Sequence, residues 1–211
     1  AAIPEGLPAV VTIVLAIGMQ RMKKKNSIVK KLHAVETLGS TTVICSDKTG
    51  TLTQNQMTVV KVFADNRLFE VSGEGYNPDG VYSLDGANVD TASKPGLDLL
   101  LRGSALCNDA RLKPGDSEKS WKITGDPTEG ALVVAAAKGG YHFEEVNAKY
   151  PRIQEIPFDS GRKMMTTFHR EADGKVIAFV KGAPDIMLDK CPRFMANGQE
   201  DTLSESVRAS I

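Results

Sequence analysis

Apolar positions run almost without interruption near the start of this chain. Nearly every residue from Ala9 to Met19 is apolar, and Pro8 stands directly before the run. Proline is tolerated in the first turn of a helix, so the pattern predicts a helix over Leu7–Lys25. The apolar run would rise about 16 Å as a helix, roughly half of the hydrocarbon thickness of a bilayer.

Two shorter elements are predicted behind this helix. Lys31–Leu38 has a helical pattern, and Gly39 is a suitable residue to end it. Thr41–Ser46 is apolar and β-branched, which predicts a buried strand. That strand would place Asp47 at its carboxyl end, where open α/β sheets bind their ligands.

Beyond Met57 strands and helices are mixed without regular βαβ alternation, which favours an α+β fold with an antiparallel sheet. Asp65-Asn66 and Ala172–Gly174 predict hairpin turns, whereas Asn77–Gly80 and Asp85–Lys94 predict a turn and a loop. The predicted strands are Met57–Phe63, Arg67–Val71, Arg152–Phe158, Met164–Arg170 and Lys175–Lys181. The predicted helices are Gly96–Cys107, Pro127–Lys138, Phe143–Tyr150, Pro184–Asp189 and one that begins after Thr202.

Charge changes this picture only near the first helix. The 26 basic and 26 acidic residues give a net charge of zero, so no nucleic-acid partner is expected. Six of the eleven residues from Arg21 to Lys31 are basic and directly follow the apolar run. That order predicts a membrane helix leaving on its cytoplasmic side, with residues 1–20 in contact with lipid. Taken alone, a basic cluster is more commonly a solvated helix face or a nucleic-acid arm.

Asp47 is the candidate catalytic residue. A carboxylate held in line with a phosphoryl group and screened by a metal ion can accept that group as an acyl phosphate. Lys48 can neutralise developing charge, Thr49 and Thr51 supply donors, and Gly50 permits a tight turn near phosphate. The alternative is an ordinary polar turn behind a strand, where Asp, Thr and Gly are all common.

The segment Asp47–Thr53 resembles the phosphorylation motif of the P-type ATPases, the ion pumps that pass through an aspartyl-phosphate. Matches to the type II, cation-transporting members run along nearly the whole chain in the expected order. They are Pro4–Pro8, Val35–Gly39, Thr124–Glu129, Phe158 with Arg162–Met164, and Lys181–Ala183. The resemblance implies ATP and Mg²⁺ as cofactors, with Asp47, Lys48 and Thr49 catalytic and Asp47 and Thr49 at the magnesium ion.

Phe158 ends a predicted strand and precedes a polar turn and a basic pair. An aromatic ring with nearby cations suits adenine stacking, although a phenylalanine that ends a strand is more often a core residue. The resemblance implies that Phe158 stacks on adenine and that Lys163 and Lys181 line the pocket, with Arg162 and Gly182 beside them. Many calcium pumps carry an arginine at the position of Ser160, so the phosphate contact made there is not expected here.

Asp126–Glu129 supports two interpretations. Asp126 as N-cap, Pro127 at the first helical position and Glu129 three residues after the cap form the pattern of a capping box. The resemblance implies instead that Glu129 faces the adenine amino group and that Asp126 and Thr128 border the pocket. A helix N-terminus at the rim of a pocket satisfies both interpretations.

Glu5 lies among Pro4, Gly6 and Pro8 beside the apolar run. Carbonyls freed by this break, together with a carboxylate, can form a site for a hard cation. The alternative is an interfacial glutamate favoured by the helix dipole. The resemblance favours cation binding, with calcium as the transported ion and a sodium/potassium-type pump as the alternative.

The chain starts without Met and inside an apolar segment, so we expect a fragment of a longer integral membrane protein with its bulk on the cytoplasmic side. The expected parts are a partial transmembrane helix and stalk (1–25), the start of an α/β phosphorylation domain (26–56) and an α+β nucleotide-binding domain (57–211). The intact protein is expected to be a cation-transporting translocase that hydrolyses ATP, and the fragment alone is expected to be inactive. The rivals are a soluble phosphatase that uses an aspartate nucleophile and a membrane-anchored nucleotide-binding module without catalysis.

Overall fold

The computed structural model describes residues 6–116, 120–209 and 211, which divide into two compact units, 1–54 and 55–211. The first unit contains α1 (Leu7–Lys23), α2 (Ala34–Gly39) and one irregular turn, Lys48–Leu52. The two helices touch where a Cβ atom on Gly18 would meet the Val35 side chain at 2.9 Å. Both predicted helices of this unit are therefore present, although α2 begins later than expected.

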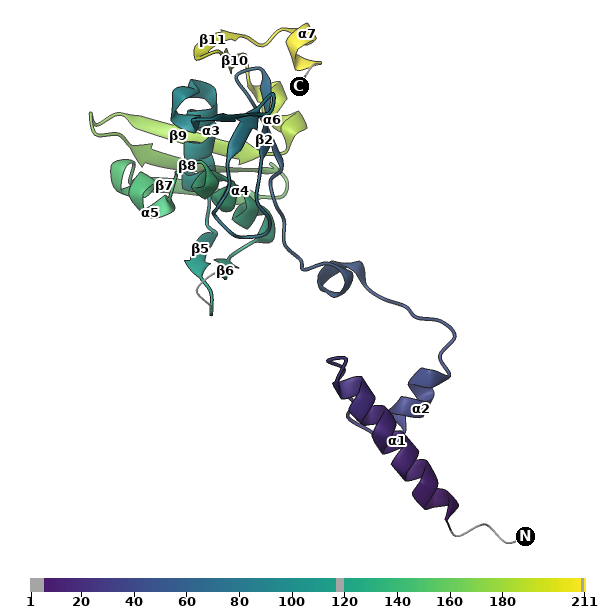
Figure 1. The fold of residues 1–211 in the computed structure, drawn as a ribbon. Coiled ribbons are helices and arrows are strands. Elements are labelled where there is room, and N and C mark those ends of the chain that lie inside the picture. Colours follow the sequence, from purple (N-terminus) through teal and green to yellow (C-terminus); the bar gives the residue numbers. More distant parts are fainter. Residues whose placement is uncertain (1–5, 117–119, 210) are drawn as a thin grey trace. The chain divides into compact units, whose positions relative to one another are not determined.

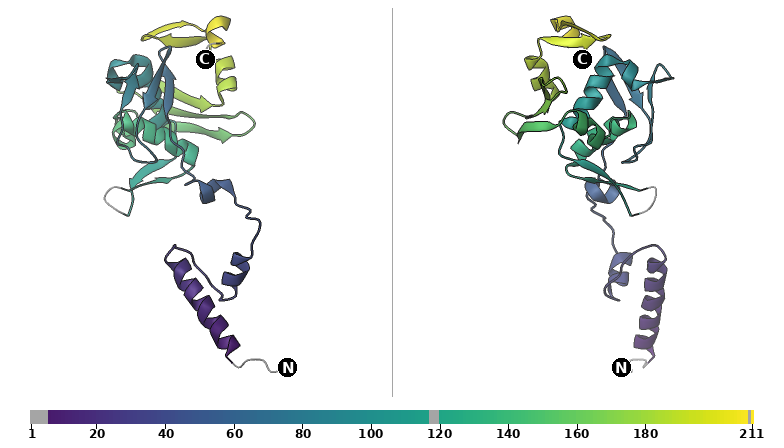
Figure 2. Two further views of the ribbon diagram at one scale, coloured as in Figure 1. Left: turned by 45° about the vertical axis from the view of Figure 1, so that its right-hand side comes forward. Right: turned by 90° about the vertical axis from the view of Figure 1, so that its left-hand side faces the viewer.

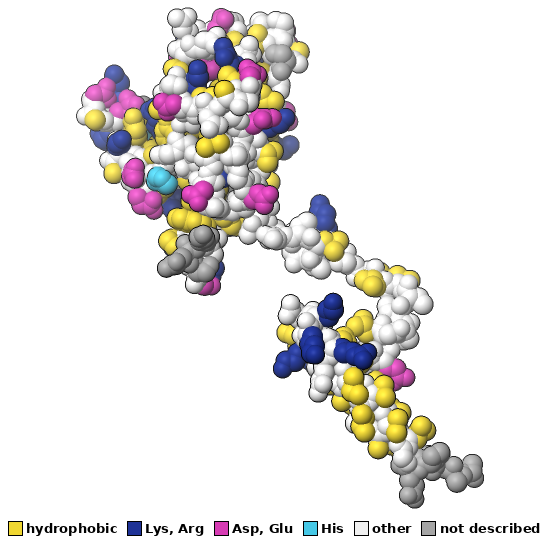
Figure 3. All heavy atoms as spheres, viewed as in Figure 1, with side chains coloured by type: hydrophobic (Ala, Val, Ile, Leu, Met, Phe, Trp, Pro, Cys, Tyr) yellow, Lys and Arg dark blue, Asp and Glu magenta, His cyan; other side chains and the backbone are white. Residues whose placement is uncertain are grey.

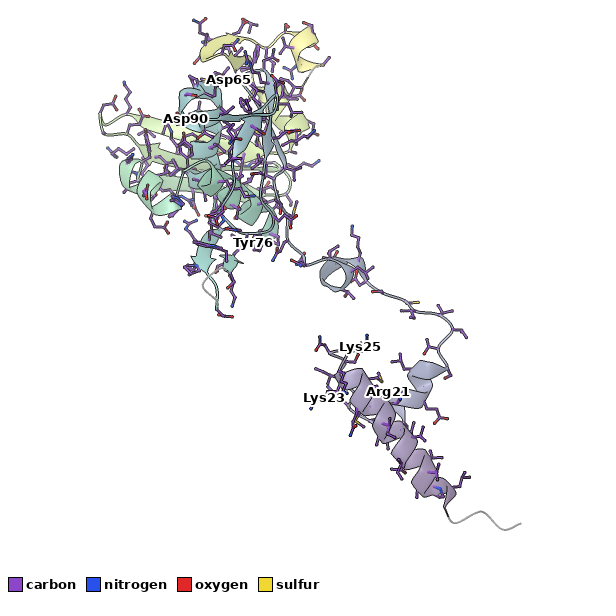
Figure 4. The ribbon with its side chains drawn as sticks, in the orientation of Figure 1. Arg21, Lys23, Lys25, Asp65, Tyr76 and Asp90 are labelled. Carbon is purple, nitrogen blue, oxygen red and sulfur yellow. The ribbon has the colours of Figure 1, made fainter. Side chains whose placement is uncertain are left out.

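Apolar side chains cover α1 and basic side chains gather at its carboxyl end (Figure 3). Arg21, Lys23 and Lys25 lie at this end (Figure 4). None of the helices within the described ranges has the length and apolar character that crossing a membrane requires. The helix of 17 residues has no buried side chain, so most of its apolar surface is exposed within this unit.

The predicted strand Thr41–Ser46 is wrong. The whole segment is exposed, with 84% of the Ile44 surface accessible, and it pairs with no other strand. A strand is held by hydrogen bonds to its neighbours. Residues 6–54 contain no strand, so no sheet forms around Asp47 and this residue does not lie at the rim of one.

Residues 55–211 form an α+β unit in which every strand pair is antiparallel. Among the described residues, its strands form small sheets of orders β1-β2-β3-β4, β5-β6, β7-β8-β9 and β10-β11. Figure 1 shows β7, β8 and β9 side by side. The strands are β1 (Lys61–Ala64), β2 (Arg67–Val71), β3 (Tyr82–Leu84), β4 (Ala87–Val89), β5 (Arg111–Pro114), β6 (Trp121–Thr124), β7 (Arg152–Asp159), β8 (Met164–Arg170), β9 (Val176–Gly182), β10 (Arg193–Ala196) and β11 (Gln199–Thr202). The helices are α3 (Pro95–Leu106), α4 (Pro127–Lys138), α5 (Phe143–Lys149), α6 (Pro184–Lys190), α7 (Glu205–Arg208) and one 3₁₀ turn, Thr91–Ser93.

The long predicted helices and the β7-β8-β9 sheet are confirmed to within about two residues, but three hairpins were missed. The predicted loop Asp85–Lys94 contains β4 and the 3₁₀ turn, and the pairs β5-β6 and β10-β11 had no counterpart. These strands have only three or four residues, too few to show alternation. The predicted strand from Met57 begins only at Lys61.

The core of this unit lies between the β1-β2-β3 meander and α3. Its fully buried members are Phe69, Tyr82, Leu97 and Leu101, and the Tyr82 hydroxyl donates to the Ala135 carbonyl of α4 over 2.8 Å. The helix α3 also contacts the three-stranded sheet, because a Cβ on Gly103 would meet the Phe179 ring. Burial of α3 on both sides makes it the central element of the unit.

One buried carboxylate links three parts of the fold. Asp65, in the β1-β2 turn, accepts hydrogen bonds from Gly96 N at the start of α3 (2.9 Å) and from Gly198 N of the β10-β11 turn (3.2 Å). Figure 2 shows the β10-β11 hairpin and α7 at the end of the unit opposite to β5-β6, and Figure 4 shows Asp65 near that hairpin. An anion at a helix N-terminus is favoured by the helix dipole, so Asp65 stabilises α3 while holding the hairpin.

His169 on β8 is fully buried and neutral. Its Nδ1 lies 2.9 Å from the Tyr150 carbonyl, which can only accept, so Nδ1 carries the proton and Nε2 accepts from the Thr167 hydroxyl at 2.9 Å. Burial lowers the pKa of His169 from its usual 6.5, and the positive charge of Arg152 lowers it further, against the effect of the Tyr150 carbonyl. The folded state therefore binds this proton less readily than the unfolded chain does.

Stability is expected to fall as the pH drops below about 6.5, because only the unfolded chain then gains the His169 proton. The contribution is fully present above the unfolded pKa and decreases by at most about 1.4 kcal/mol per pH unit. Urea unfolding at pH 7.5 and 5.5 should show a smaller pH dependence for His169→Gln than for the exposed control His142→Gln. Equal pH dependence in the two variants would contradict this assignment.

Candidate functional site

The N-terminus of α4 has the predicted cap. Asp126 Oδ1 accepts hydrogen bonds from Thr128 N (2.8 Å) and Glu129 N (3.3 Å), and Pro127 occupies the first helical position. The Thr128 amide is the main reason why the pKa of the Asp126 carboxyl is lowered. Asp126 and Thr128 are exposed, so the start of this helix is open to solvent.

A capping box also needs a hydrogen bond from the Asp126 backbone amide to the Glu129 carboxylate. This bond is not formed, because the Glu129 carboxylate has other partners. Its Oε2 accepts from Asp109 N and Ala110 N, both at 3.2 Å, and its Oε1 lies 2.6 Å from Lys181 Nζ. An ammonium group and two amides stabilise a carboxylate more than the single amide of the cap would. The capping-box interpretation is therefore confirmed for Asp126 and wrong for Glu129.

The Glu129–Lys181 ion pair joins two predicted site residues that are 52 positions apart in the sequence. Lys181 lies on β9 opposite Met165 of β8, and Glu129 lies in the first turn of α4. The side chains are 23% and 19% exposed, so the pair is screened from water only in part. A cation and a carboxylate thus face solvent together where the sheet meets α4.

Gly182 brings the β7-β8 turn close to the end of β9. Ala183 N donates to the Lys163 carbonyl over 3.1 Å, and a Cβ on Gly182 would lie only 2.6 Å from that oxygen. Any other residue at position 182 would push the turn away. Lys163 has a positive φ of 53° and is exposed. The backbone of Lys163 is thus fixed next to the strand that carries Lys181.

Phe158 lies near the end of β7 and is 61% exposed, so the interpretation of this ring as a core residue is wrong. Arg162 is less available. Its backbone amide donates to Asp159 Oδ1 over 2.7 Å, and its Nη2 donates to the Met164 carbonyl over 3.1 Å. The guanidinium is therefore partly engaged by the turn that it belongs to.

The loop that holds Glu129 was not predicted from the sequence. Asn108 is fully buried, and its side-chain amide donates to the Glu129 carbonyl over 2.9 Å and to the Ser104 carbonyl over 3.3 Å. The Asp109 and Ala110 amides bind the Glu129 carboxylate, as described above. A polar Asn-Asp pair directly behind an apolar helix was the available signal, but it does not reveal a partner 20 residues away.

Asp47 belongs to the other unit, residues 1–54. It is exposed, and its Oδ1 accepts from Thr49 N over 3.3 Å at the start of the turn that Lys48–Leu52 forms. Gly50 has a positive φ of 72°, as a tight turn requires. The carboxylate is therefore accessible, while Glu5 lies outside the described residues.

Asp47 and Thr49 do not supply all the ligands of a magnesium ion by themselves. Within the described ranges, no three acidic, histidine or cysteine side chains are grouped so that they could hold a metal ion. Magnesium sites commonly use one or two carboxylates together with substrate phosphates and water. Asp47 can supply one carboxylate ligand of such a site.

A cavity of about 350 Å³ lies elsewhere in residues 55–211, and none of the predicted nucleotide residues lines it. Its walls include Arg111, Trp121 and Phe143. The Arg111 guanidinium stacks on Phe143 at 3.5 Å and donates to the Asn108 and Ala110 carbonyls. The Arg111 guanidinium is therefore held by two backbone carbonyls and the Phe143 ring.

Comparison with known proteins gives consistent matches. Residues 96–211 match the protein family described as "P-type ATPase, cytoplasmic domain N". The chain is 46% identical over 209 residues to the calcium-transporting ATPase of Bacillus subtilis (strain 168), which covers 99% of this chain and 23% of that protein. It is 50% identical over 196 residues to a cation-transporting ATPase of Synechocystis sp. (90% and 21%) and 44% identical over 212 residues to the calcium-transporting ATPase type 2C member 1 of Bos taurus (99% and 21%). The chain thus spans between 21% and 23% of the length of these relatives.

Proposed function

This chain belongs to the cation-transporting P-type ATPases, and from that premise we propose that residues 55–211 bind ATP beside the Glu129–Lys181 pair. Lys181 and Lys163 would attract the phosphates, and the exposed Phe158 ring would stack on adenine. Glu129 would accept from the adenine amino group, with Asp126 and Thr128 at the rim. Gly182 permits the close approach of the Lys163 turn, and Arg162 would add charge only after leaving the Met164 carbonyl.

The ion pair is the observation that carries this proposal. Two motifs distant in sequence meet in one partly exposed ion pair, which is 2.6 Å long. A cation that is paired with one carboxylate on the surface gains from a second, more highly charged anion. Asp126 at the exposed start of α4 is close to this pair, whereas none of the predicted nucleotide residues lines the cavity at Trp121 and Phe143, and this favours the ion pair as the place for a nucleotide.

In the whole protein, Asp47 would accept the γ-phosphoryl group of ATP. An oxygen of the carboxylate would form the new bond to the γ-phosphorus while the bond to the β-phosphate oxygen breaks, and ADP would leave with that electron pair. Lys48 and Thr49 would stabilise the charge on the transferred oxygens. When a magnesium ion is bound by Asp47 and Thr49, it would shield the charges of the two reacting anions.

The transfer would drive transport of a cation, with calcium as the ion proposed. Two of the three relatives named above are described as calcium-transporting. Residues 1–20 would contact membrane lipid and the basic segment behind them would lie on the cytoplasmic side. Glu5 would contribute a carboxylate to the cation site.

Phe158→Ala tests the nucleotide site in the 211-residue chain. Loss of the stacking surface should weaken ATP binding about tenfold, because base stacking on an aromatic ring contributes ~1–3 kcal/mol. Phe63→Ala is the matched control, since Phe63 is also an exposed phenylalanine on a strand of the same unit. Titration calorimetry that gives equal affinities for the two variants would refute the proposed site.

A further inference from the structure

The loop behind α3 is held from one side by a single guanidinium. Arg152 of β7 donates from Nη2 to the Leu106 carbonyl (2.8 Å) and the Asn108 carbonyl (2.6 Å). Its Nη1 lies 2.8 Å from Asp109 Oδ1 and 2.7 Å from Glu155 Oε2. The side chain is only 18% exposed. Three of these four contacts are made to residues 106–109, where the carbonyls at the end of a helix lack helical partners.

The other side of the same loop holds Glu129. The amides of Asp109 and Ala110 donate to the Glu129 carboxylate, and the buried Asn108 side chain donates to the Glu129 carbonyl. The contacts described above place no bond between Arg152 and either Glu129 or Lys181. The hydrogen bonds that connect Arg152 to Glu129 therefore run through residues 106–110.

The chemistry of arginine suits this task. A planar guanidinium can bind two carbonyls with one nitrogen and two carboxylates with the other, whereas an ammonium group is a point charge with a shorter reach. Arg111 supports the same loop through the Asn108 and Ala110 carbonyls, whereas the Asp109 carboxylate forms its ion pair with Arg152. Arg152 is thus the residue that ties the loop to the strand that carries Phe158.

We propose that Arg152 is a positioning residue of the nucleotide site, which fixes the loop of residues 106–110 so that its amides orient the Glu129 carboxylate. The expected effect of Arg152 on ATP binding rests on the proposed function, whereas its effect on the loop does not. The same loop links β7, which carries Phe158, to α4, which carries Glu129. Loss of the link should therefore loosen the carboxylate without removing any group that touches the nucleotide.

Arg152→Gln in the 211-residue chain tests the positioning step without ATP. The Asp109 and Ala110 amides should exchange with solvent deuterons about tenfold faster, because their loop loses its charged hydrogen bonds. Arg193→Gln is the control, since Arg193 also pairs with a glutamate but lies exposed on β10. If Arg152→Gln does not fold, Asp109→Asn removes the charged contact alone and should accelerate both amides about threefold. Unchanged exchange in the folded variant would overturn the proposal.

The effect on ATP is tested by a double-mutant cycle with Glu129→Gln. Arg152→Gln should weaken ATP binding about fivefold in the wild-type chain and have no further effect when Glu129 is already replaced. A purely structural residue would weaken binding equally in both backgrounds, which would overturn the proposal. If the wild-type chain binds no ATP, the proposed function fails, and the amide exchange of Asp109 and Ala110 still decides whether Arg152 positions the loop.

Discussion

Asp47→Asn should reduce phosphoenzyme formation to background in a full-length protein that carries this sequence. The amide is uncharged and has no oxygen nucleophile comparable to a carboxylate, so the bond to the γ-phosphorus cannot form. We expect a loss of at least ~10³-fold, as for removal of other catalytic nucleophiles. The measurement is acid-quenched labelling from γ-labelled ATP, followed by treatment with hydroxylamine, which cleaves an acyl phosphate.

Asp79→Asn is the matched control because Asp79 is exposed and lies in a turn. Full labelling of this variant, together with none in Asp47→Asn, would support the acceptor role. A nucleotide-binding module without catalysis would show no label in any form. Label that persists in Asp47→Asn would place the acceptor elsewhere and contradict the role of Asp47.

Lys181→Met should weaken ATP binding by about 50-fold, the largest effect on ATP binding expected within residues 55–211. The substitution removes the cation and also leaves the Glu129 carboxylate without its ion-pair partner, so that this carboxylate repels the phosphates. A charged hydrogen bond contributes ~1.5–3 kcal/mol, and a 50-fold loss of affinity, about 2.3 kcal/mol, lies within that range. Titration calorimetry on the 211-residue chain measures the change.

Lys175→Met is the control for a general loss of positive charge. Lys175 precedes the same strand, is 78% exposed and pairs with Asp173 in the adjacent turn. Its replacement should change the affinity less than twofold, because exposed charges are screened by salt. Adding Glu129→Gln to Lys181→Met should restore part of the affinity, since the repulsive carboxylate is then gone. Similar losses for the two lysine variants would argue against a specific contact.

Local sequence signals predicted the parts of this fold that local interactions form. Asp126 and Pro127 correctly predicted where α4 begins, and the polar turn at Ala172–Gly174 predicted the β8-β9 hairpin. The Asn197-Gly198 pair is an equally strong signal, because Asn-Gly is typical of a tight hairpin turn. Both residues have positive φ in the structure, as such a turn requires. It was missed because the strands on either side are short and partly polar.

Non-local interactions account for the remaining errors. Thr41–Ser46 has the composition of a buried strand, but a strand forms only where partners are available, and composition cannot show them. Likewise, Glu129 satisfies a local capping pattern while its carboxylate is held by a loop 20 residues before it and a lysine 52 residues after it. The candidate residues Glu129 and Lys181 were predicted, whereas the Asn108–Ala110 loop and Arg152 became visible only in the fold.

Backbone amide shifts during an ATP titration test the nucleotide site most directly. The ¹⁵N-labelled 211-residue chain should show its largest saturable shifts at Thr128, Glu129, Lys163, Lys181 and Gly182, with little change around the cavity lined by Trp121 and Phe143. The largest shifts at that cavity, or shifts that do not saturate anywhere, would contradict the account.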